Sequence, residues 1–123
     1  MRTKRKILVV DDEQAIADTL AALLKYHGFD VYVAYSGTQA LELAFQIKPD
    51  LVVSDLMMPD TDGIEVVRVL KARLPQCRTI LFSGSMLDVN LLRAARACGY
   101  DGEILVKPVH PSDLLAKLNG PVF

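Results

Sequence analysis

The chain has 123 residues, of which 51% are hydrophobic, and a formal net charge of −1 at pH 7. This length predicts a single domain over residues 1–123, and this composition excludes an intrinsically disordered chain. The charge gives no electrostatic basis for binding nucleic acid or an anionic membrane, and neither a membrane span nor a signal peptide is present in the sequence, so we expect a cytoplasmic protein.

The first half of the chain alternates apolar runs with helical patterns. Lys6–Val10 and Asp30–Ala34 are short apolar runs that predict buried strands. The residues after the first run have the spacing of one helix face: Ile16, Leu20, Leu23 and Leu24. Ser36 with Gln39 resembles a capping box that opens a second helix, which we expect to run through Gln46.

The second half of the chain continues the alternation. The further strands predicted are Leu51–Ser54, Thr79–Phe82 and Glu103–Val106. Three more helices carry apolar residues at helical spacing: Ile64, Val67, Leu70 and Leu74, then Leu91, Ala94, Ala95 and Cys98, then Leu114, Leu115 and Leu118. This (βα)5 pattern predicts a doubly wound, three-layer α/β sandwich around a parallel sheet. The strand order 2-1-3-4-5 would place the ends of the first and third strands at one switch point.

Polar residues follow four of these predicted strands. Asp11 and Asp12 follow the first, Asp55 the third, Ser83 the fourth and Lys107 the fifth. Ligands of open parallel sheets bind outside the carboxyl ends of the strands, so we expect these side chains to converge. A cluster of carboxylates facing a lysine is costly unless groups of both signs bind between them.

Each of these residues also has a purely structural interpretation. One aspartate of the first pair could cap the following helix, and Asp55 could serve a turn or a second cap. Lys107 could be a simple counter-ion, and Ser83 a turn serine. Cys77 and Cys98 lack the spacing of metal ligands, so we expect free thiols.

Together the polar residues predict phosphoryl transfer onto a carboxylate. Oxygen ligands from Asp12 and Asp55, with a backbone carbonyl just past Asp55, suit Mg²⁺. The Lys107 ammonium and the Ser83 hydroxyl suit phosphoryl oxygens. Such catalysis is mainly positioning and charge stabilisation, with Asp55 as the nucleophile.

These motifs resemble the receiver domain of two-component response regulators, in particular a chemotaxis-regulator-like single receiver. The matching segments follow in order and at the spacing of the family: Ile7–Glu13, Asp55–Gly63, Ile80–Gly84 and Val106–Pro108. The resemblance implies a flavodoxin-like fold. It also implies that Asp55 accepts a phosphoryl group from a sensor histidine kinase or a histidine phosphotransfer protein.

The resemblance further implies a role for each polar residue. Asp12, Asp55 and the carbonyl of Met57 would bind Mg²⁺ directly, and Asp11 would act through water. Ser83 and Lys107 would hold the phosphoryl oxygens. The protein would then be a self-phosphorylating switch that dephosphorylates itself and is not a turnover enzyme. Its further partner would be a downstream target protein or an output domain outside this sequence, with no contact to nucleic acid or membrane.

One departure from the family pattern concerns the aromatic residue expected three positions before Lys107. That position is Ile104, and Tyr100 is near it in sequence but out of register. A receiver that acts only as a phosphorylation-independent binding module is therefore one alternative. A flavin carrier is another, although Asp11 and Asp12 would repel its phosphate. A haloacid-dehalogenase-type phosphatase is a third, although it needs an aspartate where Met57 stands.

Overall fold

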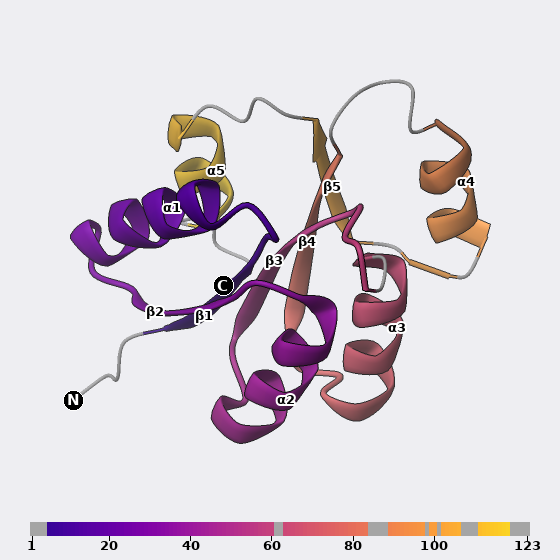
Figure 1. Cartoon of the computed structure of the whole chain (residues 1–123), viewed down its shortest axis with the longest axis horizontal. Helices are drawn as coiled ribbons and strands as arrows, with labels where there is room; N and C mark the ends of the chain where they lie inside the picture. The colour runs from indigo at the N-terminus through magenta and orange to yellow at the C-terminus, as the bar shows by residue number, and fades with distance from the viewer. Residues whose placement is uncertain are drawn as a thin grey trace.

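The computed structural model describes residues 5–60, 63–83, 89–97, 99–100, 102–106 and 111–118. Strands and helices alternate along the chain (Figure 1). The strands are β1 Lys6–Val10, β2 Asp30–Ala34, β3 Leu51–Asp55, β4 Arg78–Ser83 and β5 Glu103–Val106. The helices are α1 Gln14–Tyr26, α2 Gly37–Ile47, α3 Gly63–Arg73, α4 Val89–Ala97 and α5 Pro111–Leu118. Within the described ranges, no helix is long and apolar enough to span a membrane.

The five strands form one parallel sheet in the order β2-β1-β3-β4-β5, which confirms the predicted topology. Two strands are longer than predicted. β3 includes Asp55, which pairs with Phe82, and β4 runs from Arg78 to Ser83, which pairs with Val106. Asp55 and Ser83 are therefore the last residues of strands, and the sheet ladder fixes their backbones.

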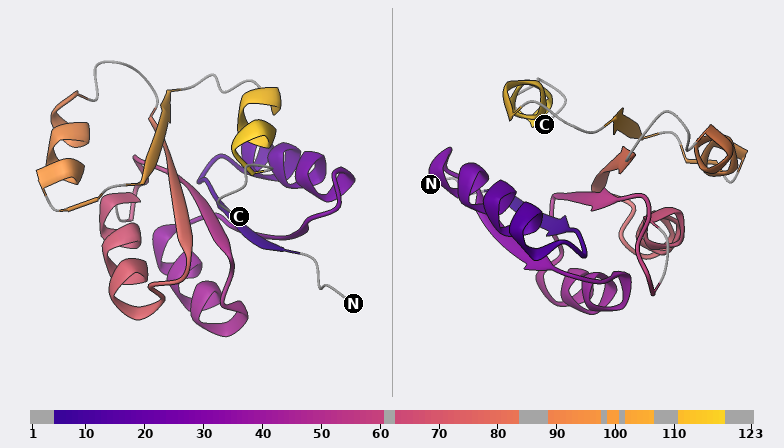
Figure 2. Two further views of the ribbon diagram at one scale, coloured as in Figure 1. Left: turned by 180° about the vertical axis from the view of Figure 1, so that it is seen from behind. Right: turned by 45° about the horizontal axis from the view of Figure 1, so that its top comes forward.

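Helices cover both faces of the sheet, with α1 and α5 on one side and α2 and α3 on the other (Figure 2). The first face contains a core of strand residues with side chains from α1 and α5: Ile7, Val9, Ala17, Ala21, Leu24, Val31, Leu51, Val53, Ile80, Phe82 and Leu114. The second packs α2 and α3 on the sheet: Leu8, Val10, Ala34, Ala40, Ala44, Val52, Val66 and Leu70. Burial on both faces explains why the strands are nearly continuous apolar runs.

The helix faces differ in detail from the prediction. In α1 the buried residues are Ala17, Ala21 and Leu24, whereas Ile16 is 40% exposed. The small alanine side chains let the helix backbone approach the sheet closely, which spacing of large apolar residues could not reveal. The fourth predicted helix is present as α4, and Ala94 within it is exposed.

The end of α3 also differs from the prediction. This helix ends at Arg73, before the apolar residue Leu74, because Pro75 disfavours a helical conformation in the residue that precedes it. Leu74 nevertheless packs against the second core from outside the helix.

Candidate functional site

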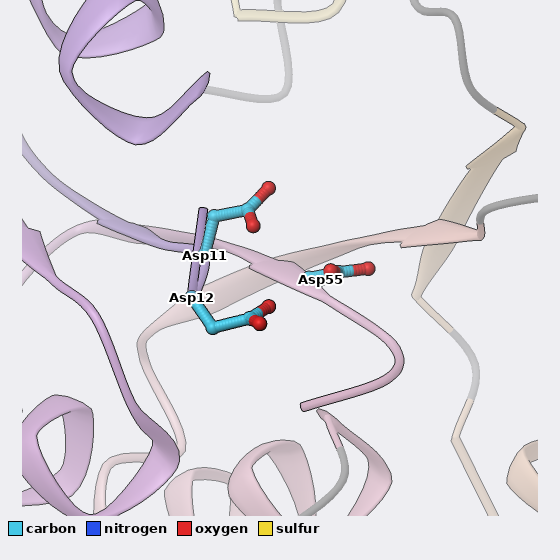
Figure 3. A group of neighbouring side chains, drawn as sticks. All are labelled: Asp11, Asp12 and Asp55. Atoms are coloured by element: carbon cyan, nitrogen blue, oxygen red, sulfur yellow. The ribbon is translucent and has the colours of Figure 1, made fainter. Parts of the chain in front are cut away.

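Three aspartates gather at the carboxyl edge of the sheet (Figure 3). One carboxylate oxygen from each of Asp11, Asp12 and Asp55 lies within 4.8 Å of the other two. Asp11 and Asp55 are buried, with 3% and 8% of their surface exposed, whereas Asp12 is exposed. The strand order produces this cluster, because β1 and β3 are neighbours and Val10 pairs with Ser54.

The turn after β1 holds the first aspartate in place. Oδ1 of Asp11 accepts a hydrogen bond from the backbone N–H of Glu13 at 3.0 Å, and the backbone N–H of Asp11 donates to the carbonyl of Ala34 at 3.2 Å. Glu13 is the N-cap of α1, and its own side chain makes no cap hydrogen bond. Helix capping therefore does not explain Asp12, whose carboxylate lies in the cluster.

The other predicted site residues lie at neighbouring strand ends or outside the described ranges. Ser83 is fully buried at the end of β4, beside the ends of β3 and β5. Met57 lies in the loop after β3, with 53% of its surface exposed. Lys107 falls outside the residues that the structure describes, as do Gly84 and Cys98.

Ile104 lies in β5, and Tyr100 precedes this strand, on the side of the sheet away from the aspartates. Ile104 pairs with Leu81 and packs against the small core that contains Leu81 and Tyr100. The Tyr100 hydroxyl lies 2.8 Å from the carbonyl of Glu103, to which it donates, and 3.2 Å from that of Thr79. Both carbonyls belong to the beginnings of strands, so Tyr100 does not replace the aromatic residue missing at position 104.

Asp60, which no pattern in the sequence singles out, links the loop after β3 to the start of α2. Its carboxylate accepts hydrogen bonds from the backbone N–H of Gly37 at 3.1 Å and from Thr38 at 3.0 Å (N–H) and 2.9 Å (Oγ1). The N–H of Thr38, followed by that of Gly37, lowers the pKa of Asp60. Ser36 caps the same helix, as predicted, by accepting from the N–H of Gln39 at 3.1 Å. The loop after Asp55 is thus anchored to a neighbouring helix.

We expect Asp60→Ala to lower the free energy of unfolding by about 1 kcal/mol at pH 7, the usual effect of losing a helix cap. Because the pKa of Asp60 is lowered on folding, its contribution is full above the unfolded value of about 4 and is lost as the pH falls through the folded value. Urea unfolding of the wild type and of Asp60→Ala at pH 7 and near pH 3 measures the contribution of Asp60 at each pH. Glu42→Ala, an exposed charge on α2, is the control. An equal effect of Asp60→Ala at both pH values would contradict the assignment.

Gly63 lets α3 begin directly against the strand that carries Asp55. Its N–H donates to the carbonyl of Leu56 at 2.8 Å, and a Cβ at this position would collide with the carbonyl oxygen of Asp55 and lie 3.0 Å from Cα of Leu56. These are backbone atoms, so they cannot rotate away. Close packing here therefore requires glycine.

We expect Gly63→Ala to destabilise the protein by roughly 1–3 kcal/mol and to weaken Mg²⁺ binding, because relief of the collision displaces the end of β3. Gly102→Ala is a matched control. Its added Cβ would meet the hydroxyl of Tyr100, a side-chain atom at the far end of β4 and β5. Urea unfolding of both variants measures the change in stability, and Mg²⁺ titration measures the change in affinity for the ion. A Gly63→Ala protein with wild-type stability and Mg²⁺ affinity would show that the turn is adaptable.

Comparison with known proteins identifies the class. Residues 7–119 match the family model of the response regulator receiver domain, and the chain belongs to this family. A receiver domain structure from Clostridium thermocellum is similar, at 32% identity and a TM-score of 0.84, covering 94% of this chain and 91% of that one.

Two further structures are also similar to this chain. The chemotaxis response regulator CheY4 of Vibrio cholerae has 29% identity and a TM-score of 0.82, covering 94% of this chain and 97% of that one. A structure described as an adenylate cyclase from Rhodopirellula baltica has 28% identity and a TM-score of 0.84, covering 95% of this chain and 86% of that one. The predicted family and the predicted flavodoxin-like fold are therefore confirmed, and the flavin carrier and the phosphatase are set aside.

Proposed function

We propose that this receiver is a phosphorylation switch in which Asp55 accepts a phosphoryl group from a phosphohistidine on a sensor histidine kinase or a histidine phosphotransfer protein. The observation that carries this proposal is the cluster of Asp11, Asp12 and Asp55 at the carboxyl edge of the sheet. Magnesium and aspartyl phosphate are typical of the family to which the chain belongs.

The donor set fits Mg²⁺. Two of the three carboxylates are buried, and like charges held this close repel each other unless a cation binds among them. Mg²⁺ prefers oxygen ligands and keeps several waters, so few carboxylates suffice. Asp12, Asp55 and the carbonyl of Met57 would bind it directly, and Asp11 through water. When bound, the ion would neutralise the charge that a phosphoryl group brings to the site.

In the proposed reaction, an Asp55 carboxylate oxygen attacks the phosphorus atom as the bond from phosphorus to the donor imidazole nitrogen breaks. The products are an acyl phosphate on Asp55 and a free histidine, which can take a proton from solvent. Hydrogen bonds from Ser83 and an ion pair with Lys107 would stabilise the phosphoryl oxygens. Hydrolysis by water would return Asp55 to its carboxylate, so the cycle resets a switch without turning over a substrate.

The proposed output is a change in contacts with a downstream target protein or an output domain. Ser83 directly follows Phe82, which pairs with Asp55 at the end of β3, so we expect the end of β4 and the loop after it to respond first. Ile104 lies in β5, the edge strand of the sheet, and packs against the core that contains Leu81, and we expect it to move little.

The test is incubation of the purified chain with acetyl phosphate, with and without Mg²⁺, followed by intact-mass spectrometry. We expect the mass of one added phosphoryl group, formed only with Mg²⁺ and lost after Mg²⁺-dependent hydrolysis. A chain that gains no mass, yet still captures a partner, would instead be a phosphorylation-independent binding module.

A further inference from the structure

A cavity of about 670 Å³ lies at the end of the sheet opposite the aspartates. Arg78 and Thr79 at the start of β4 line it, together with Glu103 and Ile104 at the start of β5. α3 and α4 contribute further lining residues, and both helices flank these strands (Figures 1 and 2). Its volume lies within the range of about 300–1,000 Å³ that is usual for small-molecule sites. At about 3.3 Å per residue, Thr79 is roughly 13 Å along β4 from Ser83, so the cavity is separate from the phosphorylation site.

Cations from three different elements line this cavity: Lys71 from α3, Arg78 from β4 and Arg96 from α4. Nη1 of Arg78 is completely enclosed by protein. Among the lining residues that the structure describes, Glu103 is the one carboxylate, and it pairs with Lys117 at 3.1 Å. The described lining thus carries an excess of positive charge.

Backbone contacts orient two of these cations. Nζ of Lys71 donates to the carbonyl of Gly99 at 3.0 Å. Nη1 of Arg96 donates to the carbonyls of Tyr100 and Gly102 at 3.0 and 3.1 Å, and its guanidinium lies 5.7 Å from the centre of the Tyr100 ring. Both hydrogen bonds of Arg96 within the described chain come from Nη1, which leaves Nε and Nη2 as donors. A ligand would therefore meet a partly ordered guanidinium, which lowers the entropic cost of binding.

We propose that this cavity binds a small polyanion, a compound with two or more carboxylate or phosphate groups. Arginine and lysine are the residues that recognise such groups through charge-assisted hydrogen bonds. Because the cations belong to α3, β4 and α4, two or more anionic groups on one molecule can pair with cations of different elements at once, which a single monovalent anion cannot. The Tyr100 ring and Ile104 supply an apolar wall for the carbon atoms of the ligand.

The experiment uses citrate as the carboxylate probe and pyrophosphate as the phosphate probe, in Mg²⁺-free buffer of constant ionic strength. Amide chemical shifts of the full chain follow each titration. We expect saturable shifts at Lys71, Thr79 and Gly102, with little change at Asp11 and Asp55. Saturation by one probe alone would identify which acidic group the cavity prefers.

Variants then locate the site. Arg96→Gln should weaken binding about tenfold or more, since a charge-assisted hydrogen bond contributes at least that much. Arg93→Gln removes an exposed charge from the same helix outside the lining and should change the affinity less than about twofold. Lys71→Gln is a second variant in case Arg96 is needed to hold its turn, and it should weaken binding similarly. Unchanged Mg²⁺-induced shifts at Asp55 would verify that each variant is folded.

Two results would overturn the proposal. One is the absence of saturation by either probe up to about 10 mM, which lies well above the range of specific small-molecule affinities. The other is equal weakening by Arg93→Gln and Arg96→Gln, which would indicate nonspecific attraction to the helix. Neither result depends on phosphorylation of Asp55.

Discussion

Asp55→Asn should abolish phosphoryl uptake from acetyl phosphate, lowering the labelled fraction by at least a hundredfold. Asparagine has nearly the same shape as aspartate, so the strand end and its pairing with Phe82 should remain. The amide nevertheless lacks the anionic oxygen that attacks phosphorus, so the chemical step has no nucleophile. The other two clustered aspartates follow a different strand, and Asp12 is exposed. Intact-mass spectrometry and peptide mapping of the labelled protein measure the effect.

Asp30→Asn is the control for this experiment, because Asp30 begins β2, at the opposite edge of the sheet from the cluster. We expect the control to take up one phosphoryl group at the wild-type rate. Labelling of Asp55→Asn to the wild-type extent would show that another residue is the acceptor. Binding of beryllofluoride with Mg²⁺ by the wild-type chain, measured in parallel, would show whether the site is competent at all.

Apolar patterning was sufficient to predict the sheet. All five strands were located from runs such as Lys6–Val10, because both faces of this sheet are covered and few strand positions are polar. The aspartate cluster followed from a general rule, that ligand sites gather at the carboxyl ends of parallel strands. Both predictions depend on local pattern plus topology, and neither needs the distance between particular side chains.

The contacts that were missed join residues distant in sequence. Asp60 caps a helix that begins about twenty residues earlier in the chain, and nothing in its local sequence indicates this partner. Arg96 stands among alanines in α4, and nothing in that local sequence indicates a contact with another part of the chain. It is exposed, yet it binds the turn that leads into β5. Such contacts depend on how helices and loops settle on the sheet, which periodicity does not determine.

Asp12→Ala should leave the stability unchanged or raise it without metal, and should lower it relative to the wild type when Mg²⁺ is added. Without metal, the substitution removes one of three negative charges whose oxygens lie within 4.8 Å of one another. Unit charges about 5 Å apart repel by about 1 kcal/mol in water and by about 3 kcal/mol at an effective dielectric constant of 20. Asp12 makes no cap hydrogen bond at the start of α1, so its loss has no such cost. The metal-free variant should therefore be as stable as the wild type or more stable by roughly 1 kcal/mol.

With Mg²⁺, the wild type should become more stable than Asp12→Ala. At a concentration about 100 times its dissociation constant, an ion that binds only the folded state stabilises it by about 2.7 kcal/mol. The wild type should gain this, whereas Asp12→Ala, deprived of a direct ligand, should gain little. Urea unfolding in EDTA and in excess Mg²⁺ gives both values, with Glu42→Ala as a control for the loss of one charge. A clearly lower stability of Asp12→Ala in EDTA would mean that Asp12 supports the start of α1, and that repulsion within the cluster is not what its carboxylate contributes.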